Sequence, residues 1–315
     1  MPAPAALLIP HAASDAPACR AALGTLQLPA LAALLARLAP GPVQRLPDAA
    51  LDTPAERALA EALALPGGDG RWPWAARAAR QAGLAPGDRA WALLTPCHLE
   101  VGMSAVGLTD PAALQLAPDE AEALLATMAP YLAEDGIVCE RWLGHAWLAH
   151  GEPWRGLATA GPERVLGEDD LHPWLPGSPL LRRLQNEMQM LLYTHPVNAA
   201  REAARRTPVN ALWISGCGTW PAAPQAAAAE PQVAVQLRDG ALRGDAAAWA
   251  QAWTQVDREH CAPLLARLQA GEPVALTLCG RRAWQRLDGR PRPAWTRLLG
   301  GWRTATSPAA VLEAL

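Results

Sequence analysis

Short apolar runs and longer stretches of helical periodicity follow one another along most of the chain. Brief runs of this kind, bounded by turn residues, predict buried strands. Five such runs lie at 5–9, 90–95, 209–215, 232–237 and 273–279. Apolar positions at helical spacing predict helices between them, at 26–38, 53–64, 72–83, 178–193, 195–205 and 246–269. Strands that alternate with helices at both ends of the chain predict an α/β fold with a mostly parallel sheet and flanking helices.

The middle of the chain has a different pattern. Residues 117–134 form an amphipathic helix, and 100–108, 137–142 and 146–149 read as further strands, the last two forming a hairpin. The stretch 151–180 is rich in Gly, Pro and acidic residues and has no clear period. We therefore predict an α/β core formed by 1–90 and 177–315, with an inserted α+β subdomain at 91–176.

Length and composition narrow the possible classes of protein. The chain has 315 residues, and 51% of them are apolar, which suits one large domain or two ordinary ones. A net charge of −3 makes nucleic acid an unlikely partner class. Six scattered cysteines without a CxxC pair are typical of reduced thiols in a cytoplasmic protein. We find neither a signal peptide nor a membrane-spanning run, so no membrane partner is expected.

The helix predicted at 178–193 places a carboxylate beside apolar side chains. Leu184, Met188 and Leu191 lie at helical spacing, and Glu187 falls on the same face. A carboxylate in such a stripe needs a partner or a raised pKa. Glu187, with Asn186 beside it, is thus either a ligand-binding group or a structural carboxylate that meets an Arg.

The phrase THPVN at 194–198 carries three polar side chains on one helical face. Thr194 is a suitable N-cap, and Pro196 is tolerated in a first turn. His195, Asn198 and Arg201 follow at i, i+3 and i+6. An imidazole, an amide and a guanidinium suit a small anion. The alternative is a packing network that fixes the entry into the next strand, which Asn210 begins.

The strand at 209–215 is followed by Gly216, Cys217 and Gly218. Glycines after a strand allow positive φ and let backbone N–H groups form an anion nest. Ligands in open α/β sheets bind near such strand ends. We expect Cys217 to be a small buried residue rather than a nucleophile.

The motifs of this region resemble a known family. HPVNAAREAARRTPVNALWISGCG at 195–218 resembles a stretch of the archaeal-type cofactor-independent phosphoglycerate mutases of the alkaline phosphatase superfamily. LTDPAALQLAPDEAEALLATMAPYLAEDG at 108–136 and LQNEMQMLLYTHPVN at 184–198 are similar to the RpfE-type regulatory proteins of that group. The resemblance covers about 91–218. It implies an alkaline-phosphatase-like core in truncated form and a retained anion pocket.

The chain departs from the mutases where metal chemistry is expected. Their first strand is followed by a metal-binding Asp, whereas the strand at 5–9 is followed by Pro10, His11 and Ala12. We find no counterpart of their catalytic Ser or of their later Asp and His clusters. Two-metal phosphoryl transfer requires several such ligands. The resemblance therefore implies the fold and does not imply the reaction.

Three interpretations follow. The first is a regulatory protein without a cofactor, whose polar pocket binds a small anionic metabolite or a protein partner. Its pocket residues would be Asn186, Glu187, His195, Asn198, Arg201, Asn210, Gly216 and Gly218.

The second interpretation is an active phosphomutase or phosphatase that uses Mn or Zn. It requires His11, Ser14, Asp15, His98 and Asp257 to meet. The third is an interaction module with an exposed Trp-rich surface at Trp72 and Trp74.

Overall fold

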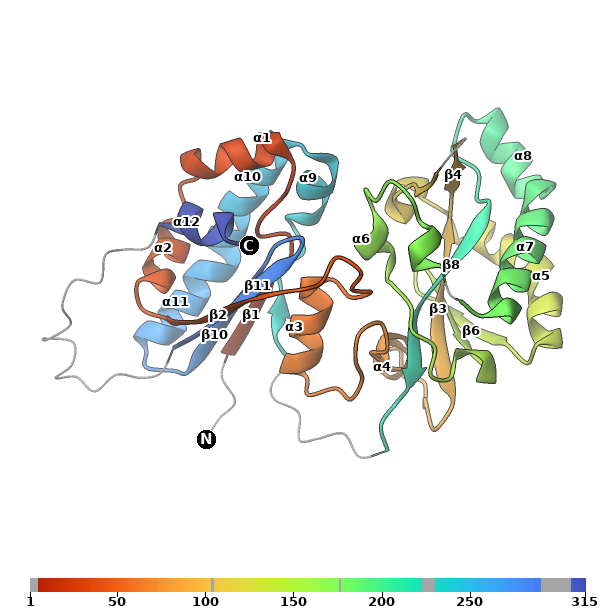
Figure 1. Ribbon diagram of the computed structural model, residues 1–315, viewed down its shortest axis with the longest axis horizontal. Coiled ribbons are helices and arrows are strands. Elements are labelled where there is room, and N and C mark those ends of the chain that lie inside the picture. Colours follow the sequence, from red (N-terminus) through yellow and green to blue (C-terminus); the bar gives the residue numbers. More distant parts are fainter. Residues whose placement is uncertain (1–4, 103–104, 176, 223–229, 290–306) are drawn as a thin grey trace, which may run out of the picture. The chain divides into compact units, whose positions relative to one another are not determined.

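The computed structural model describes residues 5–102, 105–175, 177–222, 230–289 and 307–315, which belong to two compact units. The first unit comprises Met1–Asp48, Thr53–Ala64 and Gln225–Leu315, and the second comprises Ala49–Asp52 and Leu65–Pro224. Each unit has its own sheet and its own helical layers (Figure 1).

The sheet of the first unit is mixed. Its strands, in spatial order, are β2 (Ala39–Arg45), β11 (Ala283–Gly289), β10 (Val274–Cys279), β1 (Ala5–Ile9) and β9 (Gln232–Val233). β1 pairs in parallel with both β10 and β9, whereas β10 with β11 and β11 with β2 pair antiparallel. The three adjacent parallel strands therefore end at one common edge.

Helices cover both faces of this sheet. They are α1 (Pro17–Ala22), α2 (Pro29–Leu35), α3 (Pro54–Ala62), α9 (Arg238–Arg243), α10 (Ala246–Val256), α11 (Ala262–Gln269) and α12 (Pro308–Glu313). Leu7 and Ile9 of β1 pack with α2, α10 and α11 on one face. Leu8 points to the other face, where it packs with Ala58 of α3. The period-two alternation of a strand produces this division.

The sheet of the second unit is wholly antiparallel. Its order is β6 (Val138–Trp142), β7 (Trp147–His150), β3 (Ala90–Cys97) and β8 (Ala211–Thr219). A separate hairpin joins β4 (Leu99–Val101) to β5 (Val106–Leu108). The helices are α4 (Trp74–Gln81), α5 (Pro118–Glu134), α6 (Pro162–Val165), α7 (Pro179–Tyr193) and α8 (Pro196–Ala203).

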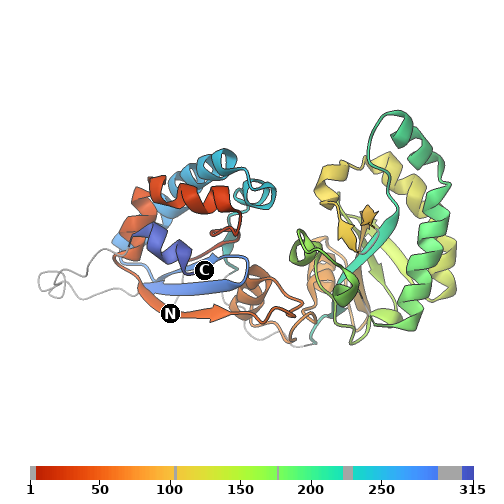
Figure 2. The ribbon, with the colours of Figure 1, turned by 45° about the horizontal axis from the view of Figure 1, so that its top comes forward.

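The two faces of this second sheet are covered differently. α5 and α7 lie side by side over one face and bury Leu124, Met128 and Met188 against it (Figure 2). α4 covers the other face, where its alanines pack on Trp91 and Leu148. The short Ala side chains let α4 approach the strands closely. The start of this helix therefore lies against the glycines of β8.

The mixed α/β class is confirmed, but fewer strands of the sheet are parallel than predicted. Only β9, β1 and β10 are parallel, because β2 and β11 extend the sheet with antiparallel pairing. β2 was missed because its sequence APGPVQR contains two prolines, which an edge strand tolerates.

The strand expected at 209–215 was assigned to the α/β core. The structure places it as β8 beside β3 in the second unit, together with α7 and α8. Residues 177–224 thus belong to the same compact unit as the stretch predicted to be an insertion.

Candidate functional site

α7 divides into a buried stripe and an exposed one. Leu181, Leu184, Met188 and Leu192 are buried. Glu187 lies outside this stripe, is 38% exposed, and meets Arg183 one turn earlier, with Nη1 and Oε1 3.8 Å apart. The structural alternative for Glu187, a carboxylate that meets an Arg, therefore matches its surroundings. Asn186 is exposed.

The exposed stripe of α7 carries two large apolar side chains. Met190 is 76% exposed and Tyr193 is 86% exposed, the highest values among the large apolar residues that the structure describes. Arg182 and Asn186 precede them at i, i+4, i+8 and i+11, which places all four on one face. The sequence does not announce this stripe, because the apolar periodicity of the helix marks only its buried face.

His195, and not Thr194, caps α8. Its Nδ1 accepts a hydrogen bond from the backbone N–H of Val197 at 3.2 Å, so Nδ1 carries no proton. Nε2 then donates to Thr127 Oγ1 at 2.9 Å in the neutral ring. The imidazole is 7% exposed; Nδ1 caps α8, and Nε2 joins α8 to α5.

Asn198 fixes the chain on either side of α8. Its Nδ2 donates to the carbonyl oxygens of Leu192 at 2.7 Å and Val209 at 2.6 Å. Its Oδ1 accepts from the N–H of Val209 at 2.8 Å. The Asn198 amide thus bonds both backbone groups of Val209, as a neighbouring strand would, just before β8 begins.

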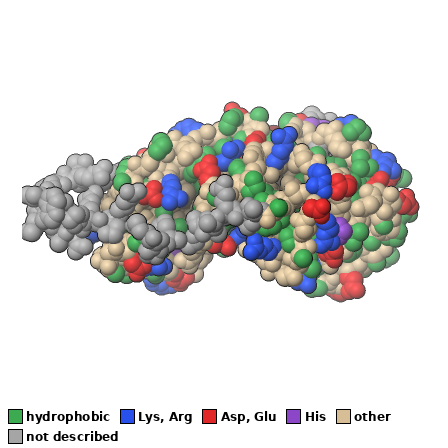
Figure 3. Space-filling model, turned by 90° about the horizontal axis from the view of Figure 1, so that it is seen from below, with side chains coloured by type: hydrophobic (Ala, Val, Ile, Leu, Met, Phe, Trp, Pro, Cys, Tyr) green, Lys and Arg blue, Asp and Glu red, His purple; other side chains and the backbone are tan. Residues whose placement is uncertain are grey.

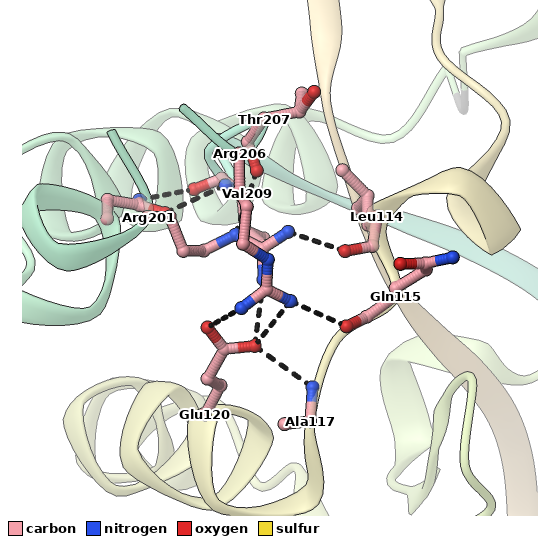
Figure 4. A network of polar contacts seen from close by, with 9 residues as sticks. Leu114, Gln115, Ala117, Glu120, Arg201, Arg206, Thr207 and Val209 are labelled. Atoms are coloured by element: carbon pink, nitrogen blue, oxygen red, sulfur yellow. Dashed lines mark hydrogen bonds and ion pairs between the residues drawn. The ribbon is translucent and has the colours of Figure 1, made fainter. Parts of the chain in front are cut away.

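Arg201 is fully buried and donates from all three of its nitrogens within the fold. Nε bonds the carbonyl of Thr207, Nη1 bonds Glu120 at 2.8 Å, and Nη2 bonds the carbonyl of Leu114 at 2.6 Å. Arg206 approaches the same carboxylate of Glu120 from the surface, as Figure 4 shows. The three bonds of Arg201 join α8, α5 and the turn at 111–114, and the one to Glu120 is charge-assisted.

Asn210 and the two glycines lie in separate places. Asn210 accepts from the N–H of Leu99 and donates to its carbonyl, so it pairs with the backbone at the start of β4. Gly216 lies inside β8, at a bulge opposite β3, with φ +64°. A Cβ there would be 3.1 Å from Cβ of Trp74, and one on Gly218 would be 3.0 Å from Pro73. The glycines allow α4 to approach the sheet, in place of the expected anion nest after the strand.

Cys217 between them is buried, as expected. Burial raises the pKa of its thiol to about 12. A thiol with so high a pKa is a poor nucleophile at neutral pH.

The eight residues predicted for one pocket therefore fall into three settings. Asn186 and Glu187 lie on the outer part of α7, His195, Asn198, Arg201 and Asn210 brace backbone segments, and the two glycines lie under α4. The sequence analysis left open a packing network as the alternative for His195, Asn198 and Arg201. Their hydrogen-bonding groups are used inside the fold.

The residues required by the phosphomutase interpretation also have separate roles. Asp257 accepts from the N–H groups of Ala30 and Leu31 and so caps α2. Ser14 donates to the carbonyl of Ala241. Within the described residues, no group of three or more His, Cys, Asp or Glu side chains could hold a metal ion. The expected Mn or Zn ligands therefore do not fit a metal site there.

The Trp-rich surface is not present at Trp72. This side chain is 7% exposed, and its Nε1 donates to the buried carboxylate of Asp52 at 2.7 Å.

Arg and carboxylate side chains are interspersed on the face shown in Figure 3. No single helix among the described residues is long and apolar enough to cross a membrane, although the bent pair Pro17–Thr25 and Pro29–Leu35 passes by length and composition when taken together.

Comparisons with known proteins give distant likenesses only. No family model matches the chain, and no curated protein matches it. Among solved structures, the PH0037 protein from Pyrococcus horikoshii is 14% identical with a TM-score of 0.46, covering 92% of this chain and 88% of that one. A cofactor-independent phosphoglycerate mutase from Thermoplasma acidophilum is also 14% identical, with a TM-score of 0.37 and 99% coverage of both chains. At this distance neither likeness assigns an activity.

Proposed function

We propose that this protein is a phosphoglycerate-mutase-like regulatory protein that acts by binding another protein through the exposed stripe of α7. The sequence motifs that resemble the RpfE-type regulators motivate the regulatory part. The observation that supports the binding part is the exposure of Met190 and Tyr193 on neighbouring turns of one helix. Met and Tyr are enriched in protein interfaces, and clustered exposed apolar side chains mark interaction sites.

The stripe has the form of a helical recognition element. Arg182, Asn186, Met190 and Tyr193 extend over about 16 Å of helix. Recognition helices present anchors at i, i+3 or i+4 and i+7 to a groove on the partner. Asn186, Met190 and Tyr193 have the spacing i, i+4 and i+7. The opposite stripe is buried in the core, so α7 does not have to fold when it binds.

The charged side chains of α7 restrict the class of partner further. Arg182 is exposed and donates to the carbonyl of Gly177, and no carboxylate pairs with it among the residues described. Arg183, by contrast, is neutralised by Asp135 and Glu187. A guanidinium without an acidic partner among the described residues at one end, and two apolar anchors at the other, complement an apolar groove with an acidic rim.

A photo-cross-linking amino acid in place of Tyr193 identifies the partner in cells, and calorimetry with the purified partner then tests the surface. Met190→Ser with Tyr193→Ser should weaken binding about a hundredfold, because interface anchors each contribute about 1–2 kcal/mol. Val235→Ser is the matched control, since Val235 is 63% exposed in the first unit. Equal affinity of the double variant and wild type would exclude the α7 surface. If the cross-linked product is a second copy of this chain, the stripe is a dimer interface instead.

A further inference from the structure

Gln236 and His260 form a polar pair in the first unit that the partner-binding surface does not use. Gln236 lies in the segment between β9 and α9, and His260 lies in the π-helical segment Asp257–Cys261 that joins α10 to α11. Gln236 Nε2 and His260 Nε2 are 2.7 Å apart, which is a hydrogen bond. Their neighbours Leu237 and Cys261 are fully buried and hold both segments in place.

Each member of the pair has a second polar atom that is buried without a partner. These atoms are Gln236 Oε1 and His260 Nδ1, within the part of the chain that the structure describes. Buried polar groups in proteins are nearly always hydrogen-bonded, because a group that leaves water without gaining a partner destabilises the fold. Both residues are themselves partly exposed. Two orphaned atoms on two bonded side chains therefore point to a third component that supplies their hydrogen bonds.

The chemistry of the pair defines that component. If the Gln236 amide N–H donates to Nε2 of a neutral His260, the ring proton is on Nδ1, and the pair offers one donor (Nδ1–H) and one acceptor (Oε1). If the amide is reversed, Oε1 accepts from Nε2–H, and the pair again offers one donor and one acceptor. A group that both donates and accepts, such as a carboxamide or a hydroxyl, complements the pair in either arrangement.

The position of the pair in the fold is suited to a ligand. β9, β1 and β10 are parallel neighbours, and Gln236 lies three residues beyond the last residue of β9. Ligands of open α/β sheets bind outside the carboxyl ends of such strands. His11, two residues after the end of β1, has a φ of +55°, which is uncommon for a non-glycine residue. π-helical segments like that of His260 also occur often at functional sites.

We propose that Gln236 and His260 form the inner wall of a binding site for a small neutral molecule that carries a carboxamide or hydroxyl group. The ligand donates to one member of the pair and accepts from the other. The site is distinct from the α7 surface, because it belongs to the first unit and uses polar recognition.

NMR of the full chain with ¹⁵N-labelled histidine tests this site, with acetamide as the probe. Acetamide should shift the ring nitrogen signals of His260 saturably, whereas N,N-dimethylacetamide, which lacks an N–H donor, should not. Gln236→Met keeps the side-chain length and removes the amide, and should weaken acetamide binding at least tenfold. Gln255→Met, an exposed change whose amide bonds Glu259, is the matched control.

Three outcomes would overturn the proposal. They are the absence of a saturable shift, an equal response to both probes, or an unchanged response in Gln236→Met. A site that holds only water would give the first of these. The comparison of the two probes on the wild-type chain stands even if Gln236→Met fails to fold.

Discussion

The amides of Asn198 in the second unit and Gln236 in the first meet their surroundings in different ways. Asn198 donates twice and accepts once, always with backbone groups of the segments that flank α8. Among the residues that the structure describes, the Gln236 amide bonds only His260, and its oxygen is buried without a partner. A polar group whose bonds are complete within the fold stabilises the fold, whereas an incomplete one is available to a ligand. The side-chain type does not distinguish the two cases.

The same contrast separates the basic groups. Arg201 looks suited to an anion in the sequence, but Thr207, Glu120 and Leu114 take all of its nitrogens. Arg182 on α7 is inconspicuous in the sequence and has no acidic partner among the described residues. The predictions below test this distinction between completed and open groups.

Arg201→Met should lower the free energy of unfolding more than any other substitution considered below. It removes a buried guanidinium and leaves two buried carbonyl groups and part of Glu120 unpaired, so we expect a loss of about 3–5 kcal/mol in the free energy of unfolding. Urea denaturation measures this loss. Arg206→Met, which removes the exposed partner of the same carboxylate, should cost less than about 1 kcal/mol. Similar losses in the two variants would show that Arg201 is not the structural member of the pair.

Removing each amide compares the two regions directly. Asn198→Leu should cost about 2–4 kcal/mol, because the N–H of Val209 and two carbonyls lose their partner. Gln236→Met should cost less than about 1 kcal/mol, since only the bond to His260 is lost. Thermal and urea unfolding of the two variants give both values. An equal cost at the two positions would remove the basis for treating Gln236 as an open group.

His195→Ala should have an intermediate effect of about 1–2 kcal/mol, because it removes the cap of α8 and the bond to Thr127. His195→Asn should recover most of the loss, since Asn is a good N-cap. Urea denaturation measures both. If His195→Asn is as unstable as His195→Ala, the stabilising contribution of His195 comes from the contact with Thr127 and not from the cap.

The smallest expected signal is the chemical labelling of the buried thiols in the folded chain. Burial raises the pKa of Cys97 and of Cys217 to about 12, so at pH 8 only about one thiol in ten thousand is ionised in the folded chain. The thiolate is the reactive form, and its fraction rises with pH, so labelling by iodoacetamide should stay slow until the chain unfolds. Mass spectrometry of folded and urea-unfolded samples checks this. Rapid modification of Cys217 in the folded protein would mean that the region under α4 opens.

Some of the architecture could be read from local pattern. The strands at Ala5–Ile9 and Val274–Cys279 and the helix at Pro118–Glu134 match their predictions closely. The capping box of Thr53 and Glu56 is present where the Thr-Pro pair indicated a helix start. These features depend on neighbours in the chain, so their signals are contained in short windows.

Other elements depended on contacts from elsewhere. β2 forms because β11 supplies its only partner, despite two prolines. β8 continues through Gly216, Cys217 and Gly218, and at the two glycines Trp74 and Pro73 at the start of α4 lie where a Cβ would be crowded. No local pattern distinguishes a glycine that serves a nest from one that makes room for a helix.

The sequence by itself determined the α/β class, most helices, and the polar character of His195, Asn198, Arg201 and Asn210. Only the tertiary structure decided which of these groups remain available, because a hydrogen bond is completed by partners such as Leu114 and Glu120, which lie more than eighty residues earlier in the chain. The tertiary structure also decided that Met190 and Tyr193 face outward and that Gln236 meets His260. Spacing along a chain shows which side chains share a face, and the fold determines what that face meets.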